Sequence, residues 1–131
     1  MIYYCMHLGI AWLYVILGAL SGALIGLNFQ RQEWLGGYGS FRRRMLRLGH
    51  ISFFGFAILN VMFGVTIELL GDRLLIASLA LLAATLMMPV LCYLTAWIER
   101  ARLFFALPVA ALCVCAALTL YGALNRIIGA M

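Results

Sequence analysis

The sequence has no lysine and few charged residues of any kind, with nine arginines and four acidic side chains among 131 residues. Soluble globular domains carry a charge on about a quarter of their residues, so a charged fraction of 10% beside 67% apolar residues excludes a soluble domain. Four runs contain no charged side chain: 1–29, 48–67, 74–98 and 103–125. Because about 20 apolar residues in a helix cross the hydrocarbon core of a bilayer, each run is long enough to span it.

These runs are continuous and rich in Leu and Ala, which favours helices over the short alternating segments of a β-barrel. The sequence therefore predicts an all-α fold, an integral membrane four-helix bundle formed by one membrane domain over residues 1–131. The later connections are short, which makes neighbouring spans antiparallel hairpins, and we expect Gly71 to end one helix and Asp72 to cap the next. The spans are expected at about 3–28, 49–70, 73–98 and 103–125.

The arginines are distributed unevenly between the two sides of the predicted bundle. Seven of the nine fall within 31–47 and 100–102, and only Arg73 and Arg126 fall on the other side. Since positive residues accumulate in cytoplasmic loops, both termini should lie outside and the arginine-rich connections in the cytoplasm. We expect the membrane to be the cytoplasmic (inner) membrane of a bacterium.

Residues 30–48 are predicted to form a cytoplasmic interfacial segment, because aromatic side chains lie beside basic ones there. Ser40 is placed to cap a helix that runs into the second span. The basic cluster that follows is typical of a face that fixes topology and contacts anionic lipid headgroups. A chain so deeply embedded has no groove-binding helix to offer, so nucleic acid is not an expected partner. The cluster comprises Arg42, Arg43, Arg44 and Arg47.

No Asp, Glu, Lys or Arg lies at the centre of a predicted span. Ion-coupled carriers normally need an ionisable group near the midplane, so this absence argues against proton- or sodium-coupled transport. The span count resembles that of the small multidrug-resistance transporters, but their pattern requires a glutamate within the first span and none is present. The four cysteines have neither C-x-x-C nor metal-knuckle spacing, and there is no nucleophile–base pair, so the sequence predicts no catalytic residue and no metal site.

Polar and small side chains recur at helical spacing on every predicted span. In lipid such residues segregate to helix contacts, so we expect all four spans to face one centre. Asn60 is the deepest strongly polar side chain and is expected to form hydrogen bonds across helices. Pro89 removes the backbone hydrogen bond to the Thr85 carbonyl, and the kink that follows can serve gating or be relieved by the Thr85 side chain. The predicted inward faces are His7, Ala11, Tyr14, Gly18, Ser21 and Asn28; His50, Ala57, Asn60, Gly64 and Glu68; Ser78, Thr85, Cys92 and Glu99; and Pro108, Cys115, Thr119 and Gly122.

Gly18, Gly22 and Gly26 form two overlapping small-xxx-small motifs on the first span. Such an edge lets another helix approach closely enough for backbone contacts. Packing against another span of the same chain is the simpler interpretation. A seam for a second copy or for a partner membrane subunit is the alternative.

His7 and His50 are the only histidines, and the predicted topology places them near opposite membrane surfaces. Two ligands separated by roughly 20–30 Å of bilayer cannot bind one metal or one haem within a single chain. Residues 47–55, RLGHISFFG, resemble the Gly-His-aliphatic-x-x-x-Gly pattern of the histidine-bearing helix in haem-copper oxidase and nitric oxide reductase-like membrane proteins. The resemblance implies a haem ligand at His50, with Arg47 one helical turn away. The alternative is an interfacial histidine beside a basic side chain.

The sequence favours a non-catalytic accessory or assembly subunit of a larger membrane complex, with no cofactor, in contact with the lipid bilayer and with a partner membrane subunit or a second copy. A second hypothesis is a redox subunit in which His50 and Arg47 bind a haem or a quinone, and in which Gly49 and Gly55 leave room beside the imidazole for a flat ring. A third is an oligomeric pore or carrier for a small solute, motivated by Pro89 and the polar inward faces.

Overall fold

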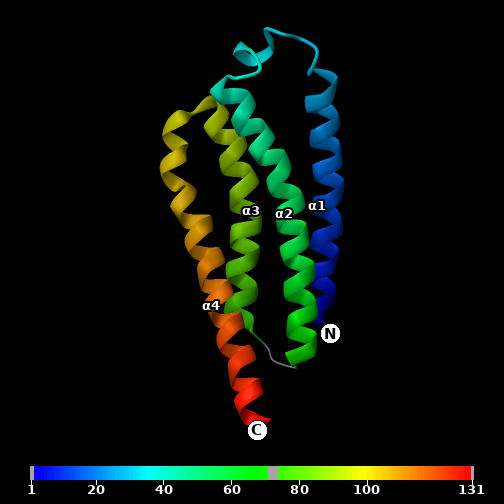
Figure 1. The fold of residues 1–131 in the computed structure, drawn as a ribbon, viewed down its shortest axis with the longest axis vertical. Helices are drawn as coiled ribbons and strands as arrows, with labels where there is room; N and C mark the ends of the chain where they lie inside the picture. Colours follow the sequence, from blue (N-terminus) through cyan, green and yellow to red (C-terminus); the bar gives the residue numbers. More distant parts are fainter. Residues whose placement is uncertain (1, 71–73, 131) are drawn as a thin grey trace.

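The computed structural model describes residues 2–70 and 74–130, and every regular element within these ranges is helical. Consecutive long helices run in opposite directions, and the start of α1 and the end of α4 lie at the same end of the molecule (Figure 1). Four helical segments are long and apolar enough to cross a membrane, so the prediction of an all-α protein with four candidate membrane spans is confirmed. The elements are α1 (Ile2–Leu27), η1 (Trp34–Gly36), α2 (Phe41–Leu70), α3 (Leu75–Trp97), η2 (Glu99–Phe105) and α4 (Ala106–Gly129).

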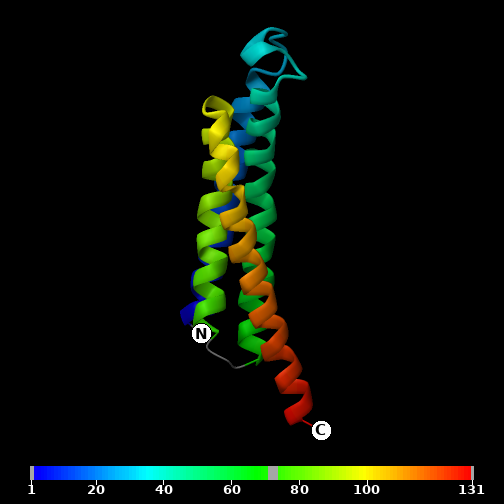
Figure 2. The same ribbon diagram turned by 90° about the vertical axis from the view of Figure 1, so that its left-hand side faces the viewer.

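The long helices pack in chain order, α1 along α2, α2 along α3 and α3 along α4, so that α1 and α4 lie at opposite edges (Figures 1 and 2). The buried residues of α4 are Pro108, Cys115 and Gly122, which lie on the face that the sequence predicted. Cys115 on that face belongs to the same core cluster as buried residues of α1, α2 and α3, whereas α4 as a whole packs mainly along α3, so the expectation that all four spans face one centre holds only in part for α4. The physical reason is composition: the middle of α4 consists of apolar and small side chains, which lipid accommodates as well as protein does.

A chain of buried polar side chains joins α1, α2 and α3. The Asn60 amide donates through Nδ2 to the Phe56 carbonyl at 2.8 Å and to Thr85 Oγ1 at 2.9 Å, which leaves Oδ1 as an acceptor. His7 Nδ1 therefore donates to Asn60 Oδ1 at 2.7 Å, and Ser78 Oγ donates to His7 Nε2 at 2.7 Å. His7 and Asn60 are completely buried, so both nitrogens of a neutral imidazole are paired inside the protein. The sequence had placed His7 near a membrane surface without a partner, and its structural role was missed.

The Tyr14 side chain replaces the backbone hydrogen bond that Pro89 removes from α3. A proline has no N–H, so the carbonyl four residues earlier, that of Thr85, loses its helical partner. The Tyr14 hydroxyl of α1 donates to this carbonyl at 2.9 Å. The sequence led us to expect that the Thr85 side chain would restore the bonding, whereas its hydroxyl accepts from Asn60 and the replacement donor comes from another helix.

The connection between α1 and α2 ends in the helix cap that the sequence predicted. Ser40 Oγ accepts a hydrogen bond from the backbone N–H of Arg43 at 3.2 Å. Helix α2 begins at Phe41, well before the span start expected at residue 49, so the arginine cluster lies on the first two turns of a long helix. The helix stop and cap expected at Gly71 and Asp72 lie outside the described residues.

Arg43 anchors this connection to α2. Its side chain is buried, and its guanidinium lies 5.2 Å from the centre of the Trp34 ring. Nε donates to the Trp34 carbonyl at 2.6 Å, and Nη2 donates to the Arg31 carbonyl. Arg42 and Arg44 are exposed, so of these three arginines they are the two available to lipid headgroups.

Candidate functional site

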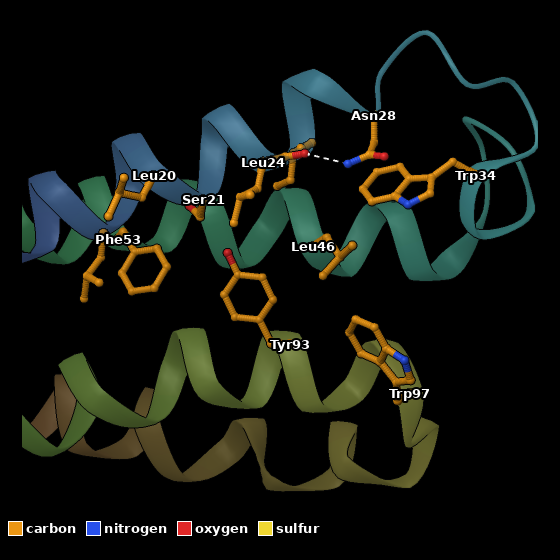
Figure 3. A pocket seen from close by; sticks show the side chains of 11 residues that line it. Leu20, Ser21, Leu24, Asn28, Trp34, Leu46, Phe53, Tyr93 and Trp97 are labelled. Carbon is orange, nitrogen blue, oxygen red and sulfur yellow. Dashed lines mark hydrogen bonds between the residues drawn. The ribbon is translucent and has the colours of Figure 1, made fainter.

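A groove opens between α1 and α3 at the end of the bundle where the arginine-bearing connection lies. Its volume is about 450 Å³, within the range of about 300–1,000 Å³ that is typical of small-molecule sites. In Figure 3 the side chains of α1 and α3 face each other across it, with α2 forming the floor. The residues that line it are Leu17, Leu20, Ser21, Leu24, Ile25, Asn28, Trp34, Leu46, Phe53, Tyr93 and Trp97.

The walls of the groove are almost entirely apolar, and none of these lining side chains carries a charge. Asn28 Nδ2 donates to the Leu24 carbonyl at 2.9 Å, and Ser21 Oγ donates to the Gly18 carbonyl at 3.0 Å. The Tyr93 hydroxyl is different, because it is buried and has no hydrogen-bond partner among the described residues. Figure 3 shows it pointing from α3 across the groove toward Ser21. A buried, unpaired hydroxyl is costly by about 1–3 kcal/mol, so its position calls for an explanation.

Gly49 of α2 determines where the Tyr93 ring lies. A Cβ atom at Gly49 would stand 3.1 Å from the Cε2 and Cζ atoms of the ring, so the absence of a side chain lets the ring lie close against α2. The ring of Phe53, one turn further along α2, lies 6.1 Å away between centroids. The tyrosine is therefore held by packing, and its buried hydroxyl is directed toward α1.

Two tryptophans flank the end of the groove nearest the α1–α2 connection. Trp34 is fixed by Arg43 as described above, and Trp97 is the last residue of α3 and is largely exposed. Figure 3 shows the two indoles approaching from opposite sides, one from the connection and one from α3. Indoles concentrate at the boundary between hydrocarbon and headgroups in membrane proteins, so this end of the groove has the composition typical of a membrane interface.

The structure does not bring His50 and Arg47 together. The His50 imidazole packs against α1, where its Cε1 atom stands 2.5 Å from the position of a Cβ at Gly22, and its Nδ1 lies 3.1 Å from Ser21 Oγ. The Arg47 guanidinium lies 4.5 Å over the Tyr38 ring and donates to the Tyr38 carbonyl at 3.3 Å. The two side chains are thus directed to different parts of the chain.

Of the two spaces expected beside His50, the one at Gly49 is filled and the one at Gly55 is open. The hollow at Gly49 holds the Tyr93 ring, whereas a Cβ at Gly55 would meet nothing within 4 Å. On the glycine edge of α1, a Cβ at Gly18 would lie 2.8 Å from the Phe54 ring, and Gly22 faces His50. These two glycines serve contacts within the chain. Only Gly26 has open space beside it, so Gly18 and Gly22 offer no seam to another molecule.

Two further hollows lie on the outer surface of the helices and differ from the α1–α3 groove in their chemistry. One, of about 410 Å³, lies between α1 and α2 and is lined by apolar side chains alone. The other, of about 250 Å³, lies between α2 and α4, and its one hydroxyl, that of Ser52, donates to the Gly49 carbonyl at 2.7 Å. Of these three hollows, the α1–α3 groove is the one lined by a side chain with a buried, unpaired hydroxyl, which makes it the better candidate for a specific ligand.

Within residues 2–70 and 74–130 no three His, Cys, Asp or Glu side chains gather into a possible metal site. The fold and the groove define a class, an integral membrane protein of four apolar helices with an uncharged groove open between two of them. Comparison with protein-family models, with curated proteins and with solved structures found no match to this chain.

Proposed function

We propose that this chain is a non-catalytic accessory protein of the membrane that holds one amphiphile in the α1–α3 groove. The observation that carries the proposal is the unpaired Tyr93 hydroxyl, buried in a groove whose walls are otherwise apolar. Ligand sites have this composition, mainly apolar with a small number of polar groups that fix orientation. The hydrocarbon part of the ligand would lie against the leucines of α1, and an acceptor atom of its polar part would pair with the hydroxyl.

The geometry supports this function better than the two alternatives drawn from the sequence. A haem at His50 would need open space beside the imidazole, whereas the position of a Cβ at Gly22 lies 2.5 Å from its Cε1 and 3.2 Å from its Nε2, and the Phe54 ring lies 5.4 Å away between centroids. A pore would need polar side chains that face water, whereas His7 and Asn60 are paired with each other in the closed interior.

The proposed orientation places the groove mouth at the cytoplasmic face of a bacterial inner membrane, with both termini outside. Arg42 and Arg44 are exposed on the first turns of α2, and seven of nine arginines lie at this end. Reporter fusions test the orientation. A reporter active only in the cytoplasm should work when inserted at Gly37, and alkaline phosphatase should be active at the C-terminus. The reverse pattern would refute the orientation.

Filling the groove tests the function itself. Leu20 and Leu13 are both exposed leucines of α1, but only Leu20 lines the groove. The Leu20→Trp variant should therefore lose the bound amphiphile, and Leu13→Trp, which adds the same ring outside the groove, should retain it. Native mass spectrometry of protein released from membranes in mild detergent measures the retained mass. Equal retention by the wild type and both variants, or no retained amphiphile in any of them, would refute the proposal.

A further inference from the structure

The chemistry of the groove narrows the choice of ligand, given the proposed function. Two cationic side chains, Arg43 and Arg47, line a small neighbouring hollow that shares Ile25 and Trp34 with the groove. Both are engaged there by backbone carbonyls and aromatic rings of the connection. With no charge among the side chains that line the groove and with both guanidiniums of the neighbouring hollow already paired, the groove itself is complementary to a neutral polar group.

The depth of the Tyr93 hydroxyl along α3 also favours a neutral ligand. Tyr93 precedes Trp97 by one helical turn, a rise of about 6 Å along α3. Helical side chains lean toward the helix N-terminus, and in Figure 3 the hydroxyl extends further still from the tryptophans. The donor therefore lies below the aromatic belt, within the hydrocarbon. The charged headgroup of a phospholipid lies above this level, whereas a neutral ring that carries a carbonyl can reach it.

Aromatic side chains surround this donor. The Phe53 and Tyr93 rings are inclined at 37° to each other, and Trp34 and Trp97 stand toward the mouth. Aromatic rings favour offset or edge contacts with a flat ring. The remaining wall, formed by leucines of α1, suits a branched hydrocarbon tail.

We propose that the amphiphile held between α1 and α3 is a prenylated quinone, whose ring carbonyl accepts a hydrogen bond from the Tyr93 hydroxyl and whose tail lies along α1. The inference rests on the proposed function and adds to it the class of ligand and the residue that recognises it. It also moves the donor from His50, where the sequence had placed a quinone contact, to a tyrosine of α3. The ring is bound and oriented, and no chemical step on it is assigned to this chain.

A pair of matched ligands tests the inference. One probe is a benzoquinone that carries a decyl chain, and the other is decylbenzene, which has the same chain and ring without carbonyls. Both compete with a fluorescent long-chain probe for the purified protein. In the wild type the quinone should bind about fivefold to tenfold more tightly than decylbenzene, the effect of one neutral hydrogen bond. In Tyr93→Phe this preference should vanish while the affinity for decylbenzene is unchanged, and Tyr121→Phe, an exposed position on α4, should keep it.

The outcomes separate this inference from the function on which it rests. If both probes bind the wild type equally, or if Tyr93→Phe keeps the preference, the quinone assignment is wrong and the groove still holds an amphiphile. If neither probe displaces the fluorescent chain and Leu20→Trp does not weaken its binding, the groove is not a ligand site and both proposals fall.

Discussion

The contact between Gly22 and His50 yields the sharpest prediction about packing. In Gly22→Ala the added methyl group would stand 2.5 Å from the imidazole Cε1, far inside van der Waals contact, so the ring must move and give up the hydrogen bond of its Nδ1 to Ser21. Overpacking of this kind costs about 1–3 kcal/mol. The helix itself gains about 1 kcal/mol when Gly becomes Ala, so the net change should range from about zero to a loss of about 2 kcal/mol.

Gly9 supplies the control, since it also lies within α1 and a Cβ there would meet nothing within 4 Å. Gly9→Ala should keep the helix gain without the clash and so be stabilising by up to about 1 kcal/mol. Thermal unfolding in detergent, followed by circular dichroism, should place the midpoint of Gly22→Ala below that of Gly9→Ala. In a His50→Ala background the cost of Gly22→Ala should disappear. Equal midpoints for the two alanine variants, or the same cost with and without His50, would refute the contact.

Three further predictions concern the polar contacts and the connection. Tyr14→Phe should be destabilising by about 1–3 kcal/mol, because the Thr85 carbonyl loses its hydrogen-bond donor. This loss of stability should be smaller in a Pro89→Ala background, where a backbone N–H is again present to bond that carbonyl. An equal loss in both backgrounds, measured by thermal unfolding, would contradict the contact. His7→Phe should lower the free energy of unfolding by a similar amount, because it leaves Asn60 Oδ1 and Ser78 Oγ unpaired. His50→Phe should lower it less, and the reverse order would contradict the buried hydrogen bonds of His7. Arg43→Ala should free the connection and accelerate trypsin cleavage after Arg31, with Arg42→Ala as the control that leaves the rate unchanged.

The sequence predicted the helices well because hydrophobicity and helical spacing are properties of each segment by itself. Each span is recognised by a run of residues without charge that is long enough to cross a bilayer. The inward face of each span is recognised by polar and small residues at helical spacing. Ser78, Thr85 and Cys92 of α3 and Pro108, Cys115 and Gly122 of α4 are all buried, as that spacing predicted. Glu68 and Glu99, which the same spacing placed on inward faces, are exposed, because they lie at helix ends where a charged side chain can leave the interior. The Ser40 cap placed the start of α2 correctly, and the basic residues 42–47 lie on its first turns, before the membrane span expected from residue 49.

The groove was not predictable in the same way, because it depends on pairings between helices. Nothing in the spacing of Gly49 and Tyr93 shows that the ring of one rests on the backbone of the other, and that contact is what presents the hydroxyl. Helical spacing did place His7 on an inward face and Gly22 on a glycine edge suited to close helix contacts, yet it could not identify Asn60 and His50 as their partners. The sequence feature that could have indicated the groove is aromatic: Tyr93 lies one helical turn before Trp97 at the end of a span.

An experimental structure of the chain in a lipid nanodisc prepared from native membrane lipids tests the central claim most directly. Elongated density between α1 and α3, with a polar end within hydrogen-bond distance of the Tyr93 hydroxyl and a tail along Leu20 and Leu24, is the result expected. A groove closed by movement of α1 onto α3, or a Tyr93 hydroxyl paired with a side chain or backbone carbonyl of the chain itself, would contradict the account.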